Sequence, residues 1–141
     1  MNKRLLGIDF GEARTGIAIC DSNGLIATGL HTVSGKRPLA DLAQHIADIA
    51  HENRAVGIIL GLPLNMDDSE SEKCMLVREL AELIKNCGLP VTLWDERCTT
   101  LAAQEILRET KTKRKKRKQN VDALAAQILL QDYLDNGVKH A

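Results

Sequence analysis

The stretch Leu5-Leu-Gly-Ile-Asp-Phe-Gly-Glu-Ala-Arg-Thr-Gly-Ile-Ala-Ile19 predicts two β-strands, residues 5–10 and 15–19, joined by a glycine-flanked turn. Because side chains alternate between the two faces of a strand, Asp9 shares a face with Gly7. A carboxylate in an apolar strand is costly to bury unless a cation, hydrogen-bond donors or a metal compensates it. Asp9 is therefore either a site residue or an acid that backbone N–H groups of the following turn satisfy.

The segments that follow predict an α/β protein with a mixed sheet. Asn23-Gly24 is a hairpin dipeptide, so a strand over 25–33 would complete an antiparallel meander with the first two. Apolar residues at helical spacing predict a helix over 38–53. The continuous apolar run 56–62 is typical of a parallel strand that is buried on both faces.

The second half of the chain predicts further helices and one more strand. The spacing of Ser69 and Glu72 predicts a capping box at the start of a helix, and residues 91–95 predict the fifth strand. Another helix is expected from Thr99 or Thr100 to about 110. A last helix, capped by Asn120 and ended by Gly137, should bury Val121, Leu124, Ala125, Ile128 and Leu129. With no repeat or linker, we expect one domain over residues 1–141.

The charge is unevenly distributed, although 19 basic and 19 acidic side chains give a formal net charge of zero. Residues 111–118 contain seven cations in eight positions. Such a block favours contact with a polyanion over a merely solvated loop. The residues predicted to bind nucleic acid here are Lys113, Arg114, Lys115, Lys116, Arg117 and Lys118. Only three aromatic residues are present, which argues against a stacking platform for single strands.

Several other classes of protein are disfavoured by the composition. The four cysteines form no C-x-x-C pair, which makes a zinc site improbable. The apolar run after Lys3 and Arg4 is short and is broken by Asp9, so we expect no signal peptide. No window reaches the length of a membrane span. We therefore expect a cytoplasmic protein with reduced thiols.

Three acids could converge on one site, namely Asp9, Glu96 and Asp122. Glu96 directly follows the fifth predicted strand, and alternation places Asp95 on the opposite face. Asp122 lies in the first turn of the last helix, where small alanines would permit close packing on a sheet. Three adjacent carboxylates need a compensating cation. Oxygen ligands suit Mg²⁺ or Mn²⁺, and a pair of such ions supports phosphodiester hydrolysis.

The chain resembles the YqgF (RuvX) family of ribonuclease H-like nucleases, which are associated with pre-16S ribosomal RNA processing and with Holliday-junction resolution. The resemblance implies a five-stranded mixed sheet in the order 3-2-1-4-5, flanked by helices on both faces. The matching motifs are Gly7-Ile-Asp-Phe-Gly11 with Gly16, Gly61-Leu-Pro-Leu-Asn-Met-Asp67, Asp95-Glu-Arg97 with Thr99-Thr100, and Val121-Asp-Ala-Leu-Ala-Ala126 with Ile128-Leu129.

The resemblance also implies roles for the three acids. Asp9 would bridge two metal ions, and Glu96 and Asp122 would complete the ligand set, so that water rather than a protein nucleophile attacks the phosphorus. Related resolvases use a fourth carboxylate, for which Asp67 and Asp68 are candidates. We further expect nucleic-acid contacts from three residues outside the basic block, which are Arg14, Asn65 and Arg97.

The leading hypothesis is a metal-dependent nuclease that processes the 5′ end of pre-16S ribosomal RNA, with a pre-ribosomal particle as a candidate partner. Cleavage of branched DNA by a resolvase is the alternative with the same chemistry. A non-catalytic nucleic-acid-binding module would retain the fold and lack turnover. A monomer or weak homodimer without a membrane partner is expected, whereas a resolvase would normally act as a symmetric dimer.

Overall fold

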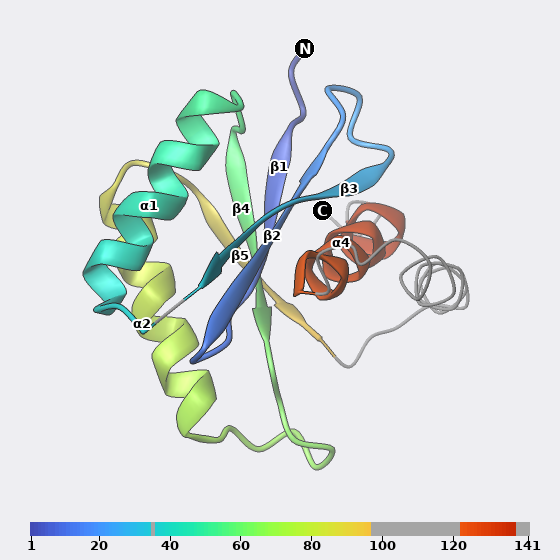
Figure 1. The fold of residues 1–141 in the computed structure, drawn as a ribbon. Coiled ribbons are helices and arrows are strands. Elements are labelled where there is room, and N and C mark those ends of the chain that lie inside the picture. The colour runs from blue at the N-terminus through green and yellow to red at the C-terminus, as the bar shows by residue number, and fades with distance from the viewer. Residues whose placement is uncertain (35, 97–121, 138–141) are drawn as a thin grey trace, which may run out of the picture.

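The sheet of the computed structural model has the predicted order, β3-β2-β1-β4-β5 (Figure 1). The structure describes residues 1–34, 36–96 and 122–137. The first three strands pair antiparallel, whereas β1 pairs parallel with β4, and β4 with β5. The strands are β1 (Leu5–Asp9), β2 (Arg14–Cys20), β3 (Ala27–Ser34), β4 (Gly57–Leu62) and β5 (Val91–Asp95).

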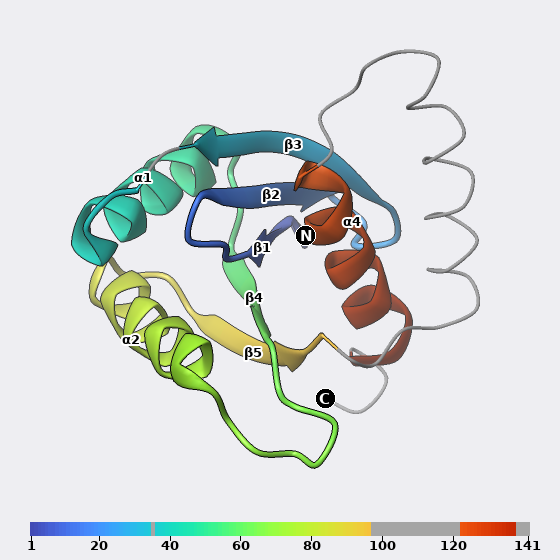
Figure 2. The same cartoon turned by 60° about the horizontal axis from the view of Figure 1, so that its bottom comes forward.

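Helices cover both faces of this sheet, as the family resemblance implies (Figures 1 and 2). One face carries α1 (Leu39–Glu52) and α2 (Glu72–Asn86). The other face carries α4 (Asp122–Asp132), which continues into a π-helical turn, η1 (Tyr133–Gly137). None of the helices that the structure describes is both long and apolar enough to cross a bilayer.

Two apolar clusters hold these layers together. The larger cluster lies between the sheet and the α1–α2 layer and contains the fully buried Ile8, Ile17 and Leu60. The smaller cluster lies under α4 and contains Ile59 and Leu130. Every residue of β4 is buried, so the prediction of a central strand covered on both faces is confirmed.

Two sequence predictions about the helices need correction. The second helix begins at Glu72 with Ser71 as its N-cap, because Ser69 is engaged in the preceding loop, where its hydroxyl accepts a 3.0 Å hydrogen bond from Asn65. In α4, Leu124 and Leu129 are buried as predicted, whereas Ala125 is exposed and Ile128 is half-buried. The cluster under α4 instead takes Ala126, Leu130 and Leu134, which follow i, i+4 spacing. Val121 lies outside the described residues.

Close approach of α4 to the sheet depends on a glycine in β1. A Cβ atom on Gly7 would lie 2.7 Å from the Cβ atom of Leu130 and 3.1 Å from the carbonyl oxygen of Ala126. The helix can therefore sit on β1 only because this position has no side chain. Near the start of α4 the helix also approaches β3 closely. A Cβ atom on Gly29 of β3 would lie 3.1 Å from the Cβ atom of Ala123.

We expect Gly7→Ala to lower the free energy of unfolding by about 1–3 kcal/mol, since the added methyl group would push α4 away from β1. Gly57→Ala, on the neighbouring strand β4, is the matched control. Its Cβ would meet the flexible end of Leu5 at 3.1 Å, which can move aside. Urea unfolding measures both variants, and equal midpoints would contradict close packing at Gly7.

Candidate active site

Asp9 lies at the carboxyl end of β1, on the face of the sheet that α4 covers. It pairs with Gly16 of β2, so no side chain stands beside it on that strand. Gly7, two residues earlier on the same face, contacts α4. The Asp9 side chain is half-buried. This position suits a functional carboxylate, because ligands of open α/β sheets bind at the carboxyl ends of the strands.

Glu96 directly follows β5 and lies on the same face as Asp9. Trp94, two residues earlier, belongs to the cluster under α4, whereas Leu93 packs into the cluster on the other side. Alternation therefore turns Asp95 away from Asp9, as the sequence predicts. The backbone N–H of Glu96 donates a 3.3 Å hydrogen bond to the carbonyl of Leu62, which ties the residue to the end of β4.

Gly61 makes room for the Glu96 side chain on the strand between the two acids. A Cβ atom at Gly61 would overlap the carboxyl group of Glu96. The side chain thus lies across the bare backbone of β4 toward β1, where it is hydrogen-bonded to Asp9. Gly61 is not among the site residues that the sequence predicts. A glycine inside the apolar run 56–62 was the available signal, since such a glycine marks close approach.

Asp9 and Glu96 form a carboxyl pair that shares a proton. The pKa of Glu96 is raised from the ordinary 4.5 to about 8, first by burial and then by the hydrogen bond and negative charge of Asp9. Asp95 raises it further, and the ammonium group of Lys73 opposes the shift. At neutral pH Glu96 therefore keeps its proton and donates it in the hydrogen bond to Asp9.

The donor set of this pair fits a hard divalent cation. Both side chains offer only oxygen atoms, the ligands that Mg²⁺ and Mn²⁺ prefer. A cation between them would also allow both carboxyl groups to ionise, because it would compensate the repulsion between two adjacent negative charges. Within residues 1–34, 36–96 and 122–137, no group of three His, Cys, Asp or Glu residues could hold a metal ion.

Asp122, the third predicted acid, is the first residue of α4. This helix packs on the face that carries Asp9 and Glu96, and the next residue, Ala123, lies against Gly29 of β3. The side chain of Asp122 is outside the described residues. The structure thus brings two of the three acids together, and the convergence of Asp122 with them stays a prediction.

The hydroxyl group of Thr32 lies in the same row of the sheet, and it is not among the site residues that the sequence predicts. Asp9 pairs with Gly16, and Gly16 pairs with Thr32 of β3. The Oγ1 atom of Thr32 is buried and has no hydrogen-bond partner in the described part of the chain. A buried polar atom of this kind usually has a partner. No periodicity or motif in the sequence distinguishes this threonine from others.

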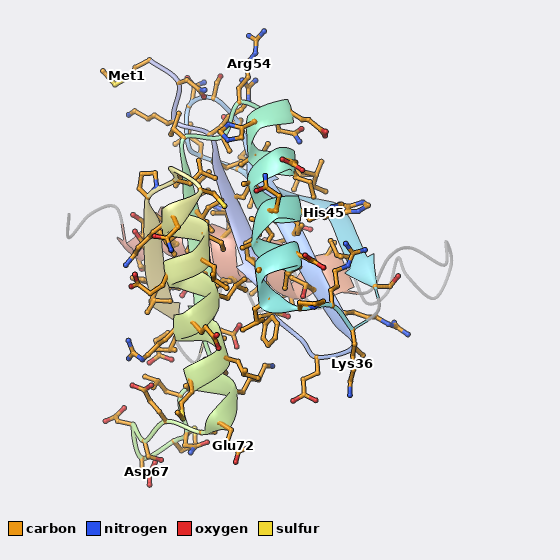
Figure 3. The ribbon with its side chains drawn as sticks, turned by 90° about the vertical axis from the view of Figure 1, so that its left-hand side faces the viewer. Met1, Lys36, His45, Arg54, Asp67 and Glu72 are labelled. Atoms are coloured by element: carbon orange, nitrogen blue, oxygen red, sulfur yellow. The ribbon has the colours of Figure 1, made fainter. Side chains whose placement is uncertain are left out.

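The loop after β4 holds some of the other predicted site residues. Asn65 donates its side-chain amide to Ser69, so it braces the loop. Asp67 accepts hydrogen bonds from the backbone and side chain of the same serine. Asp68 has a left-handed backbone, with φ of 68°. Figure 3 shows Asp67 at the lower end of the molecule, beyond Glu72.

The remaining predicted nucleic-acid contacts are placed only in part. Arg14 is exposed at the first position of β2, beside the turn that follows Asp9. Arg97 and the basic block, Lys113, Arg114, Lys115, Lys116, Arg117 and Lys118, lie outside the described residues. Their roles stay predictions.

The raised pKa of Glu96 predicts a pH-dependent stability. Between pH 4.5 and about 8 the unfolded chain loses the proton that the folded chain keeps, so stability should fall as pH rises through this range. We expect a loss of about 1–3 kcal/mol, because solvent reaches part of the side chain. Urea unfolding with chelator should show this loss in the parent and not in Glu96→Gln. A parent whose stability is flat over this range would contradict the shifted pKa.

Two solved structures share the fold of this protein. The T. thermophilus RuvC in complex with a Holliday junction substrate superposes with a TM-score of 0.68 at 13% identity, over 99% of this chain and 97% of that one. The Thermus thermophilus RuvC structure gives 0.63 at 16% identity, over 95% and 96%. The fold is accordingly ribonuclease H-like, the fold of RuvC.

Comparison of sequences places the chain within one family of this class. A family model described as "RuvX: Holliday junction resolvase" matches residues 3–136. A protein of Rhodopirellula baltica named "Putative pre-16S rRNA nuclease" is 43% identical over 133 residues, which are 94% of this chain and 76% of that protein. A protein of Myxococcus xanthus with the same name is 41% identical, over 94% and 87%. The chain therefore belongs to the RuvX family. It is a nuclease, a hydrolase that acts on ester bonds of nucleic acid.

Proposed function

We propose that this nuclease depends on Mg²⁺ or Mn²⁺ and processes structured RNA, namely the 5′ end of pre-16S ribosomal RNA. The observation that carries the proposal is the Asp9–Glu96 carboxyl pair at the carboxyl end of the parallel strands. The names of the relatives support the RNA substrate. A cytoplasmic location and a pre-ribosomal particle as partner follow from this substrate.

Asp9, Glu96 and Asp122 would hold the cation. When bound, Mg²⁺ or Mn²⁺ supplies Lewis-acid activation of water and compensates charge at the phosphate. Asp9 and Glu96 supply two carboxyl oxygens from neighbouring strand ends, and Gly61 leaves the space in which they meet. Glu96 must give up its proton before both side chains can act as anionic ligands. Affinity for the cation should therefore rise with pH, because the proton on Glu96 competes with the cation for the same carboxyl group.

Positive side chains would hold the RNA on this edge of the sheet. Arg14 is exposed beside the turn that follows Asp9. Arg97 and the six cations from Lys113 to Lys118 would add phosphate contacts. The loop around Asn65, which is braced by the hydrogen bond to Ser69, would lie beside the bound RNA. The chain would act as a monomer or weak homodimer, because one acid trio per chain is sufficient for hydrolysis.

We expect neutralisation of the cations from Lys113 to Lys118 to weaken RNA binding and to reduce its salt dependence. Each phosphate contact that is lost lowers, by about one, the slope of the logarithm of the binding constant against the logarithm of the salt concentration. The single-turnover cleavage rate at saturating protein should change less, since the acids are untouched. Filter binding at several salt concentrations measures the effect. Equal affinity and slope in the neutralised protein would show that the block is merely solvated.

Cleavage of branched DNA is the second candidate function. The description of the family model and the fold shared with T. thermophilus RuvC favour it. Resolution of a four-way junction requires two symmetric cuts, so it predicts an active dimer. A non-catalytic binding module is the third candidate, and it predicts salt-dependent binding without turnover.

One assay separates the three candidates. Precursor RNA and a four-way DNA junction are incubated with the protein in Mn²⁺ and in chelator, with the oligomeric state measured in parallel. The RNA proposal expects cleavage of the precursor in Mn²⁺ alone. Paired cuts in the junction by a dimer, with intact RNA, would replace it by resolvase activity. Tight binding of either substrate without any cut would leave only the binding module.

A further inference from the structure

A cavity opens on the opposite face of the sheet from the acid pair. Its volume is about 480 Å³, within the range of small-molecule sites. Strands β2 and β3 contribute to its wall on one side, and α1 and α2 on the other. The apolar side chains that line it are Phe10, Val33, Leu39, Leu42 and Leu76. We call it the Phe10 cavity.

The mouth of the Phe10 cavity is positively charged. Lys36 and Arg37, both exposed, come from the segment between β3 and α1. Glu12 is the one acid among the described residues that line the cavity. Thr15 offers a polar group on the wall, because this buried residue lines the cavity and its hydroxyl donates a long, 3.5 Å hydrogen bond to the carbonyl of Gly11. The oxygen of this hydroxyl can still accept a hydrogen bond from a ligand.

The cavity and the acid pair open at the same end of the sheet. Phe10 directly follows Asp9, and alternation places the two side chains on opposite faces of the end of β1. Figure 3 shows Lys36 at the same end of the molecule as Asp67 and Glu72, away from Met1 and Arg54. A chain of nucleotides that crosses this edge at Asp9 could therefore reach the mouth of the cavity.

We propose that the Phe10 cavity binds one unpaired nucleotide of the substrate strand, with its base inside and its phosphate on Lys36 and Arg37. This inference rests on the proposed nuclease function. A nucleobase has apolar faces that suit Phe10 and the leucines, and its polar edge can use Thr15 and Glu12. Cations at the mouth match the phosphate that every nucleotide carries. Extrusion of a base costs least where it is already unpaired, so the cavity selects structured RNA with such a nucleotide near the cut.

Methyl NMR of the Asp9→Asn protein tests the cavity without any cleavage. Val33, Leu42 and Leu76 carry methyl probes on its walls. The probes added are adenosine and uridine monophosphates, with ribose 5-phosphate as the control that lacks a base. We expect the nucleoside monophosphates to shift these methyl signals at millimolar concentrations, and ribose 5-phosphate to leave the interior unchanged. Failure of both nucleotides to shift them would overturn the proposal.

Matched variants assign the binding to the cavity. Leu76→Trp fills it from α2, and Met75→Trp adds the same group at the adjacent position, which is 68% exposed and outside the lining. We expect the first variant to weaken nucleotide binding at least tenfold and the second to leave it unchanged. Removal of the mouth cations in Lys36→Ala/Arg37→Ala should weaken binding several-fold without affecting the fold. The control is Lys3→Ala/Arg4→Ala, which removes two cations just before β1. Equal losses of nucleotide affinity in the two double variants would contradict the proposal.

An RNA hairpin with one unpaired 2-aminopurine distinguishes a substrate nucleotide from a free one. We expect its fluorescence to change on binding to the Asp9→Asn protein and to the Met75→Trp form of it, and not to the Leu76→Trp form. Binding of free nucleotides with no response from the hairpin would overturn the assignment to the substrate strand. All of these measurements detect binding to Asp9→Asn proteins and need no cleavage. A negative result in the cleavage assay is therefore distinguishable from a negative result for the cavity.

Discussion

Asp9→Asn is expected to lower the rate of metal-dependent cleavage by about a thousandfold or more. Asn keeps the shape of the side chain and removes the negative charge that a divalent ion needs, and stabilisation by such an ion amounts to several kcal/mol in the transition state. The fold should survive, because Asp9 is half-buried and ends its strand. Single-turnover cleavage of precursor RNA in Mn²⁺ measures the loss.

Two comparisons show whether the loss arises at the acid pair. Asp41→Asn removes an exposed acid from the first turn of α1 and should cleave like the parent. The loss of the Asp9 charge should also lower the pKa of Glu96, since that charge and the hydrogen bond contribute to its elevation. Carboxyl NMR titration measures this pKa. An active Asp9→Asn protein with an unchanged Glu96 pKa would show that the pair is not the site.

Gly61→Ala should reduce cleavage by about a hundredfold through a single methyl group that touches no substrate. The new Cβ would occupy the position of the Glu96 carboxyl group, so Glu96 would have to leave Asp9. Displacement of a catalytic group by about 1 Å can have an effect of this size. Gly57→Ala, four residues earlier on β4, is the control, because its Cβ meets only the movable end of Leu5 and a backbone oxygen at 3.7 Å.

A double variant isolates the contact between Gly61 and Glu96. If Gly61 acts by making room for Glu96, then Gly61→Ala should cause little further loss in a Glu96→Gln background. Independent, multiplicative losses would mean that Gly61→Ala damages the site in another way. Circular dichroism and thermal melting of each protein exclude unfolding as the cause.

Local patterns were sufficient to predict most of the architecture. Alternation in residues 5–10 and the buried run 56–62 predicted strands that the structure confirms at β1 and β4. The strand order came from the resemblance, because no local pattern states which strands are neighbours. The start of α2 was wrong for a related reason. Ser69 has the spacing of a capping residue, but its hydroxyl has closer partners in the loop that tertiary structure closes.

The sequence by itself determined which acids could share a face, since alternation alone separates Glu96 from Asp95 and couples Asp9 to Gly7. Only the tertiary structure decided that Asp9 and Glu96 meet. Their contact joins residues 87 positions apart in the chain across a third strand, and it exists because parallel pairing aligns three strand ends and Gly61 carries no side chain between them. Alternation relates only residues that are close in sequence, whereas the contact between Asp9 and Glu96 forms only when the sheet has assembled.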